Sequence, residues 1–376
     1  MVQKIPQSGI SGNSSFRNLL INGDMKISQR AVSASGLTGS GYATLDRWYV
    51  DINNAGTWTI SQTTTVPTGQ GFFNSQKWDC TTADGSLASG DRIFYSQRIE
   101  DRFCTPLKKG TSSAVSITVS FWVRSNKTGT YICEVYDSQN ARHISKSYTI
   151  DSADTWEKKI IVFPGDTTGA FANDNGVGLQ LDFWLAAGTN YTSGTLATAW
   201  QANDATDRAV GQLNLADSTS NEWYITGVQL EAGDQATDFE HLPFDINLLR
   251  CQRYCEVLCD TRSSDTGTFS SGDADESLGV LGACHGTRYA YMTFRFTTAK
   301  RSNAPTLVSS NDTDHFIMYN VLTNDKFTNI VTSGVFSHFA MECYFDTGAT
   351  SNLTNGAAGM CRSHTAGAKL LILDEI

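Results

Sequence analysis

Hydrophobic and polar residues alternate with a period of two along much of the first 242 residues. The alternating runs are 116–125, 131–137, 179–185 and 223–230. Clusters of Gly, Asn, Asp and Ser separate them, and Gly227 interrupts the last run. A period of two places side chains on alternate faces of a β-strand, and a glycine within a strand marks a bulge. Such short, punctuated strands predict an all-β protein whose main domain is an antiparallel jelly-roll β-sandwich.

Shifts in this pattern divide the chain into segments. Residues 1–44 are rich in Ser and Gly and predict an N-terminal arm, in which 16–23 is expected to form a short strand ending at an Asn-Gly turn. Residues 45–242 carry the sandwich pattern. In residues 243–262 apolar side chains recur every three or four positions, which predicts a single linking α-helix.

The last segment, 263–376, returns to short β-like runs and predicts a smaller C-terminal β domain. These runs are 289–297, 307–310, 315–322, 336–345 and 368–373. All eight Trp lie between Trp48 and Trp223, and six of the nine Cys come after position 243. Opposite biases of this kind indicate two separately built cores. The length of 376 residues agrees with this, because one domain usually has about 100–200 residues.

Composition and charge exclude several classes of protein. The net charge is −10, so the chain has no overall basic surface for nucleic acid. Aromatic residues make up 11%, which indicates packed cores rather than a disordered chain. No stretch approaches the roughly 20 apolar residues of a transmembrane helix, so no membrane insertion is expected. The first 16 residues lack the apolar segment of a signal peptide, and we expect synthesis in the cytoplasm without export.

Three cysteines, Cys251, Cys255 and Cys259, lie four positions apart and would share one face of the predicted helix. Two interpretations are open: buried packing, which is usual for free cysteines, and a thiolate metal site. Carboxylates within 166–182 are compatible with calcium, but Asp, Asn and Gly are also ordinary turn residues. We favour packing and turns, and expect free thiols, no metal ion and no other cofactor.

Motifs of common enzymes are missing from the sequence. It has no G-x-S-x-G, no H-E-x-x-H, no phosphate-binding loop and no dinucleotide fingerprint. Glycoside hydrolysis needs two facing carboxylates. Glu231 and Glu240 flank the end of a predicted strand and are expected to make hydrogen bonds within a loop instead. We therefore expect a protein that binds its ligand without catalysing a reaction.

Tryptophan and tyrosine are the side chains that point most directly to a ligand. Their flat faces and polar edges suit sugars, although we expect at least six of the eight Trp to be mainly buried. The candidate glycan-binding residues are Trp200, Trp223, Tyr289, Tyr291 and Tyr319.

Three blocks of sequence stand out by their order and spacing. They are NLLINGDMKISQR (18–30) with TLDRWY (44–49), then SFWVRS (120–125), then ITGVQLEAG (225–233) with ATDFEH (236–241) and CQRY (251–254). Together they resemble bacteriophage tail-fibre and related receptor-binding virion proteins with a carbohydrate-binding-module-like jelly roll.

The resemblance implies a homotrimer on the virion, at the phage tail or capsid surface. It implies that the N-terminal arm contacts other virion proteins and that the C-terminal domain is the receptor-binding tip. We expect a tail fibre that mediates host attachment through multivalent, non-covalent binding to cell-surface polysaccharide. Two alternatives stay open: a capsid-decorating or adaptor virion protein without receptor binding, and a glycan depolymerase or esterase.

Overall fold

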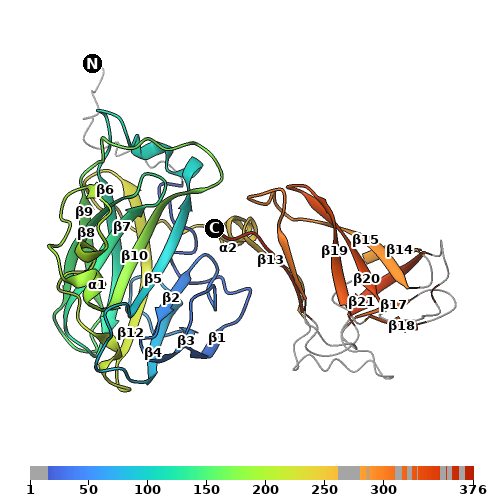
Figure 1. The fold of residues 1–376 in the computed structure, drawn as a ribbon, viewed down its shortest axis with the longest axis horizontal. Coiled ribbons are helices and arrows are strands. Elements are labelled where there is room, and N and C mark those ends of the chain that lie inside the picture. Colours follow the sequence, from blue (N-terminus) through green and yellow to red (C-terminus); the bar gives the residue numbers. More distant parts are fainter. Residues whose placement is uncertain are drawn as a thin grey trace, which may run out of the picture. The chain divides into compact units, whose positions relative to one another are not determined.

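The computed structural model describes residues 16–260, 280–285, 288–309, 316–319, 324–327, 329–347, 353, 358–363 and 369–376. The chain forms two compact units, Met1–Leu242 and Pro243–Ile376, which we call the N-terminal and C-terminal units (Figure 1). Two short α-helices are present in the described residues, α1 (Thr189–Thr192) and α2 (Phe244–Gln252). Neither of them has the length and hydropathy needed to cross a membrane.

The N-terminal unit is a jelly-roll β-sandwich of two six-stranded antiparallel sheets. The order in the first sheet is β1 (Ser33–Leu37), β3 (Thr57–Thr63), β4 (Ser75–Thr82), β12 (Glu222–Ala232), β6 (Ile117–Ser125) and β9 (Glu157–Phe163). The order in the second sheet is β11 (Gln201–Ala202), β8 (Arg142–Ile150), β7 (Gly129–Asp137), β10 (Val177–Ala187), β5 (Arg92–Glu100) and β2 (Tyr49–Asn53). The predicted fold class is therefore confirmed.

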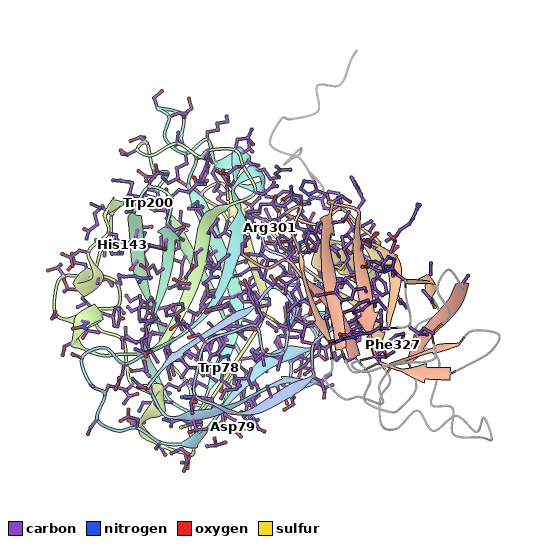
Figure 2. All side chains as sticks on the ribbon, turned by 45° about the vertical axis from the view of Figure 1, so that its right-hand side comes forward. Trp78, Asp79, His143, Trp200, Arg301 and Phe327 are labelled. Carbon is purple, nitrogen blue, oxygen red and sulfur yellow. The ribbon has the colours of Figure 1, made fainter. Side chains whose placement is uncertain are left out.

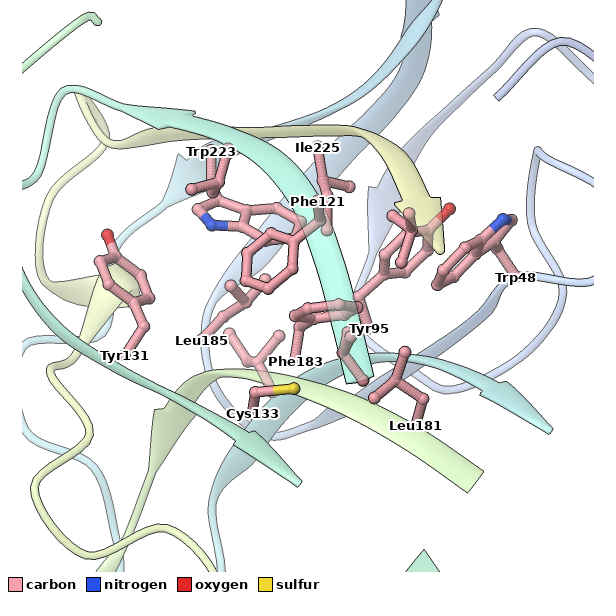
Figure 3. Close-up of a cluster of buried hydrophobic side chains, with 14 of the residues drawn as sticks. Trp48, Tyr95, Phe121, Tyr131, Cys133, Leu181, Phe183, Leu185, Trp223 and Ile225 are labelled. Carbon is pink, nitrogen blue, oxygen red and sulfur yellow. The ribbon is translucent and has the colours of Figure 1, made fainter. Parts of the chain in front are cut away.

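Alternation along the strands produces the core between the two sheets. Val119 and Phe121 point inwards from β6 and are 0% exposed. The ring of Phe121 lies 4.9 Å from that of Phe183 in the opposite sheet, while Trp48 stacks on Tyr95 at 4.9 Å (Figure 3). Aromatic pairs of this kind add about 0.5–1.5 kcal/mol each beyond the burial of their area.

The bulge predicted in β12 is present. The pairing of β12 with β6 shifts register between Thr226 and Gln229. Gly227 has φ 61°, in the left-handed region that residues with a side chain rarely adopt. The extra residue bends the strand at the point where the loops that carry Phe72 and His241 approach it.

Residues 17–31 lie in the sandwich and do not form an arm. Met25 is 0% exposed and belongs to the core. The amide of Val228 donates to the carbonyl of Gly23 at 2.9 Å, and a Cβ on residue 23 would lie 2.1 Å from the carbonyl oxygen of Val228. The prediction of an arm over 1–44 is wrong for these residues, because their apolar side chains complete a core formed by strands far along the chain.

The strand predicted at 16–23 is absent. Asn22 takes a left-handed conformation with φ 59°, and its side chain donates to the carbonyl of Ile27 at 2.8 Å and accepts from the amide of Ile27 at 2.9 Å. This closed turn replaces a strand ladder. Residues 1–15 lie outside the described residues, so a contact with other virion proteins through them stays a prediction.

The outer face of the second sheet is covered by residues 188–213, which include α1 and β11. Apolar side chains of this cover pack on outward-facing strand residues; the cluster contains Phe94, Ile132, Trp184 and Ala209, with Ala187, Tyr191 and Leu196 against it. Figure 2 labels His143, which lies on β8 of the second sheet, and Trp78, which lies on β4 of the first sheet.

An ionic cluster lies beneath this cover. Arg208 donates to both carboxylate oxygens of Glu134, from Nε at 2.8 Å and from a terminal nitrogen at 3.0 Å. The Trp184 indole also donates to Glu134 at 2.9 Å, and His143 Nδ1 lies 3.1 Å from it. Burial alone would raise the pKa of Glu134, but the charge of Arg208 brings it below its usual value. Burial raises the pKa of the neighbouring Asp182 to about 7.

The C-terminal unit contains two antiparallel sheets of unequal size. A three-stranded sheet has the order β13 (Cys255–Asp260), β22 (Lys369–Leu373) and β16 (Thr306–Ser309). A seven-stranded sheet has the order β18 (Asn324–Lys326), β17 (Phe316–Tyr319), β21 (Ala358–Ser363), β14 (Val280–His285), β15 (Tyr289–Arg295), β20 (Ala340–Asp346) and β19 (Asn329–Phe336). Their shared core includes Met292, Phe294, Phe345 and Ile372.

The linking helix is shorter than the predicted 243–262. It ends at Gln252, and Cys255 begins strand β13, which pairs with β22. A short apolar run fits helix and strand alike, and pairing with a distant strand decides between them. Cys251 and Cys255 are both buried, as the packing interpretation expects, but they do not share a helix face with Cys259, whose side chain lies outside the described residues.

The run predicted at 336–345 is also divided. β19 ends at Phe336 and β20 begins at Ala340, and the turn between them is closed by the amide of Ser337 donating to the carbonyl of Ala340 at 2.9 Å. The sequence 337–339 therefore reverses the chain inside what looks like one alternating run.

Candidate functional site

A pocket of about 170 Å³ opens on the outer face of the first sheet of the N-terminal unit. Its wall is formed by three strands and by two loops that meet over them. The lining residues are Gln70, Phe72, Ser120, Trp122, Lys158, Gly227, Asp238, Phe239 and His241.

Strands β6 and β9 supply one side of the pocket. The alternation that turns Phe121 into the core turns Ser120 and Trp122 outwards, and Trp122 is half-buried. Lys158 is paired with Trp122 across the ladder to β9. Directly opposed side chains in an antiparallel pair lie about 5 Å apart at Cβ, so the indole and the ammonium share this wall.

Three rings form the other side of the pocket. Phe72 lies 5.1 Å from Phe239 and 5.3 Å from His241, and Phe239 lies 4.9 Å from His241. The ring of Phe72 sits on the bulge, where a Cβ on Gly227 would lie 2.5 Å from its Cζ. A glycine at the bulge is thus needed both for the backbone angle and for the approach of this ring.

Hydrogen bonds hold the loop that carries Asp238, Phe239 and His241. Glu231 accepts from the amide of Thr237 at 2.8 Å. The amide of Glu240 donates to the side chain of Gln229 at 2.8 Å, and the carboxylate of Glu240 accepts from the amide of Asn18 at 3.0 Å. Glu231 and Glu240 therefore make the hydrogen bonds within loops that the sequence predicts, and they preorganise one wall of the pocket.

The polar groups of the pocket are free to meet a ligand. Within the described part of the chain, neither the ammonium of Lys158 nor the carboxylate of Asp238 makes an ion pair. Burial lowers the pKa of His241, and the charge of Lys26 lowers it further. The imidazole is therefore neutral at pH 7 and offers one donor and one acceptor. No cluster of metal-ligating side chains occurs among the described residues.

This arrangement suits a polyhydroxylated ligand with an apolar face. The rings of Trp122, Phe72 and Phe239 can contact the C–H face of a sugar, while Asp238, Lys158 and Gln70 can exchange hydrogen bonds with its hydroxyl groups. The volume is below the roughly 300 Å³ at which pockets for drug-sized ligands begin, so it matches a single small ring.

A serine, a histidine and a carboxylate line the pocket, but they are not connected as a catalytic set. In the described residues no hydrogen bond joins Ser120 to His241, or His241 to Asp238. Activation of a serine needs its hydroxyl within about 3.2 Å of the base.

The five residues suggested by the sequence lie elsewhere. Trp223 is 0% exposed and packs against Tyr95 and Phe183 in the core, so its assignment to a glycan site is wrong. Trp200 is half-buried, and its indole donates to the carbonyl of Pro164 at 2.7 Å.

The three tyrosines belong to the C-terminal unit. Tyr289 and Tyr291 lie together on one face of β15 and are partly exposed. Tyr319 lies on β17, and its side chain is outside the described residues. The structure therefore brings two of the five suggested residues together and places neither of them in the pocket.

Trp122 is the tryptophan that lines the pocket, and it was not among the candidates suggested by the sequence. Trp48, Trp58, Trp78, Trp184 and Trp223 are buried, at 0–1% exposure, whereas Trp122, Trp156 and Trp200 are half-buried. The expectation that at least six of the eight Trp are mainly buried is therefore confirmed. The alternation of inward and outward side chains along β6 could have identified Trp122, because a strand that turns Phe121 into the core turns Trp122 to the outer face.

No family model matches the sequence, and a search of curated proteins finds no match. Solved structures do resemble the sandwich. One is the enzymatically active domain of tailspike protein 4 of bacteriophage CBA120, with 12% identity and a TM-score of 0.31 over 58% of this chain and 22% of that one. The present chain thus spans about a fifth of that tailspike chain.

Two carbohydrate-binding modules resemble the chain similarly. A family 61 module, in complex with β-1,4-galactotriose, has 12% identity and a TM-score of 0.29, covering 57% of this chain and 99% of that one. The family 11 module of Clostridium thermocellum has 10% identity and a TM-score of 0.29, covering 56% and 99%. These likenesses concern the fold of the sandwich alone. Membership of a tail-fibre family stays a prediction.

Proposed function

We propose that this protein is a bacteriophage tail-fibre protein that attaches the virion to glycans on the host surface and does not degrade them. The observation that carries the proposal is the pocket, in which the rings of Trp122, Phe72 and Phe239 and the polar side chains of Gln70, Lys158 and Asp238 surround a space the size of one sugar ring. The order and spacing of the sequence blocks at 18–30, 120–125 and 225–233 support the assignment to the virion.

The energetics of a small sugar site support a multivalent assembly. A single shallow site often reaches only millimolar affinity, about −4 kcal/mol. Three copies in a homotrimer, and several fibres on one virion, raise the avidity by about 10² or more without any new contact. The proposed trimer thus has a functional reason, and light scattering of the purified protein should give three times the chain mass.

The binding proposal is tested with full-length protein on an array of bacterial lipopolysaccharide and capsular glycans. Trp122→Ala removes the ring on β6 and should weaken binding to the recognised glycan at least tenfold, which corresponds to about 1.4 kcal/mol. Trp156→Ala is the matched control, because Trp156 is also half-buried and packs 6.2 Å from Tyr224 without lining the pocket. Equal binding by the two variants would refute the pocket as the site.

A second candidate, an esterase that removes acyl groups from glycans, is favoured only by the presence of Ser120, Asp238 and His241 in one pocket. Incubation with acetylated and deacetylated polysaccharide separates the two functions. A binding protein leaves both substrates intact. Release of acetate by the wild type, abolished in Ser120→Ala, would replace the binding proposal by the hydrolytic one.

A further inference from the structure

The outer face of the seven-stranded sheet in the C-terminal unit is aromatic. Along β15 the side chains alternate, with Ala290, Met292 and Phe294 buried in the core and Tyr289 and Tyr291 partly exposed on the other face. The core side is therefore complete without the tyrosine rings. Two exposed tyrosines on alternate positions of one strand form the beginning of a flat surface.

Neighbouring strands extend this surface. Tyr344 of β20 is the direct ladder partner of Tyr291, and their rings lie 5.6 Å apart; Tyr344 lies 5.3 Å from Tyr289. On the other side, His285 of β14 is exposed and lies 5.7 Å from Tyr291. Figure 1 shows β14, β15 and β20 adjacent in the unit. We call His285, Tyr289, Tyr291 and Tyr344 the tyrosine face.

The charges around the tyrosine face are balanced. Arg288 donates to both oxygens of Asp346, at 2.5 and 2.7 Å, and its guanidinium lies 5.2 Å from the ring of Tyr289. Arg295 and Glu342 carry one charge of each sign at the other end of the same two strands. Among the described side chains, the surface therefore offers no net charge to attract an ionic partner.

We propose that the tyrosine face is a second carbohydrate-binding site, which takes a segment of a neutral polysaccharide chain laid across the strands. Each ring offers an apolar face and a hydroxyl group, which matches the alternation of C–H faces and hydroxyls along a sugar chain. Only the ligand class rests on the function proposed above.

The two sites differ in what they recognise. The pocket of the N-terminal unit accommodates one ring, and the tyrosine face is an open surface with several rings in a row. A protein with both would hold a branch or end of a polysaccharide at one site and its backbone at the other. When both sites bind the same polymer, the apparent dissociation constant is lower than that of either site by itself.

Affinity electrophoresis of the full-length protein tests the proposal, with a soluble galactan, a mannan and a glucan as probes. The variant Tyr291→Ala/Tyr344→Ala is compared in the wild-type and in the Trp122→Ala background, with Thr293→Ala as control because Thr293 is exposed on the same strand. We expect retardation by at least one probe to fall at least tenfold with the double substitution in both backgrounds, and to stay unchanged with Thr293→Ala.

The outcomes separate this proposal from the pocket. Retardation that depends on Tyr291 and Tyr344 but not on Trp122 supports the tyrosine face as a site separate from the pocket, which is tested by the glycan array. Unchanged retardation in the double variant, or no retardation of any protein by any probe, refutes the tyrosine face. Should the double variant misfold, nitration of the wild-type tyrosines by tetranitromethane decides the question: the bound probe should protect Tyr289, Tyr291 and Tyr344, and undiminished nitration overturns the proposal.

Discussion

The buried ion pair between Glu134 and Arg208 should be a large single contribution to the stability of the N-terminal unit. Glu134→Ala removes the carboxylate that receives two hydrogen bonds from Arg208 and one from the indole of Trp184. The guanidinium then stays under the cover formed by residues 188–213, with a weaker contact to Asp182 at 3.5 Å. An uncompensated buried charge is far less stable than a buried pair.

The magnitude follows from the burial of both partners. Glu134 is 0% exposed, and removing one partner of such a pair costs about 3–5 kcal/mol. In a unit of this size, each kcal/mol lowers the melting temperature by about 2–4 °C, so the transition of the N-terminal unit should fall by roughly 6–20 °C. Arg208→Ala should cost a similar amount, and the double variant should cost clearly less than the sum, because both charges leave together.

Differential scanning calorimetry and urea unfolding of the three variants measure this coupling. Asp151→Ala is the control, because the carboxylate of Asp151 is 70% exposed and its ion pair with Lys159 should contribute less than about 1 kcal/mol. The reasoning is refuted if Glu134→Ala costs no more than Asp151→Ala. Strict additivity of the Glu134 and Arg208 substitutions would equally contradict it.

Two further predictions concern the bulge and the second buried carboxylate. Gly227→Ala should destabilise the unit by about 1–2 kcal/mol because of its left-handed backbone, and further because the new methyl group meets the ring of Phe72. The same substitution should weaken glycan binding. Gly36→Ala is the control in urea unfolding: Gly36 has φ 69° and open space around it, so this variant should show only the backbone effect. Asp182→Asn should flatten the pH dependence of the melting temperature. The raised pKa of Asp182 means that the wild type loses stability as the pH rises from about 4 to 7, since the carboxyl ionises earlier in the unfolded chain; an unchanged slope would contradict this.

The sequence contains enough information to predict one wall of the pocket, but not the two loops that close it. The alternation around Phe121 is enough to place Trp122 outside the sandwich, and the glycine at 227 is enough to expect a bulge. That Phe72 and His241 meet over this bulge depends on two loops from distant parts of the chain. No local pattern encodes such a meeting, because it results from the pairing of strands that are far apart in sequence.

The tyrosine face shows the same division. Alternation in β15 places Tyr289 and Tyr291 on one side, which the sequence already contains. Tyr344 joins them only because β20 pairs with β15 in a particular register. A shift of one residue would turn Tyr344 into the core and Phe345 out of it, so the register decides whether a third tyrosine lies on this surface.

The amino-acid sequence by itself determined the class of this protein: short strands of period two, turns of Gly, Asn and Asp, and two cores with different aromatic content. Tertiary structure decided that residues 18–25 and Ile27 are buried in the sandwich and not part of an arm, and that Cys255 begins a strand instead of continuing a helix. The physical reason is that periodicity reports the two faces of one segment, whereas burial and strand pairing depend on partners that only the folded chain brings near.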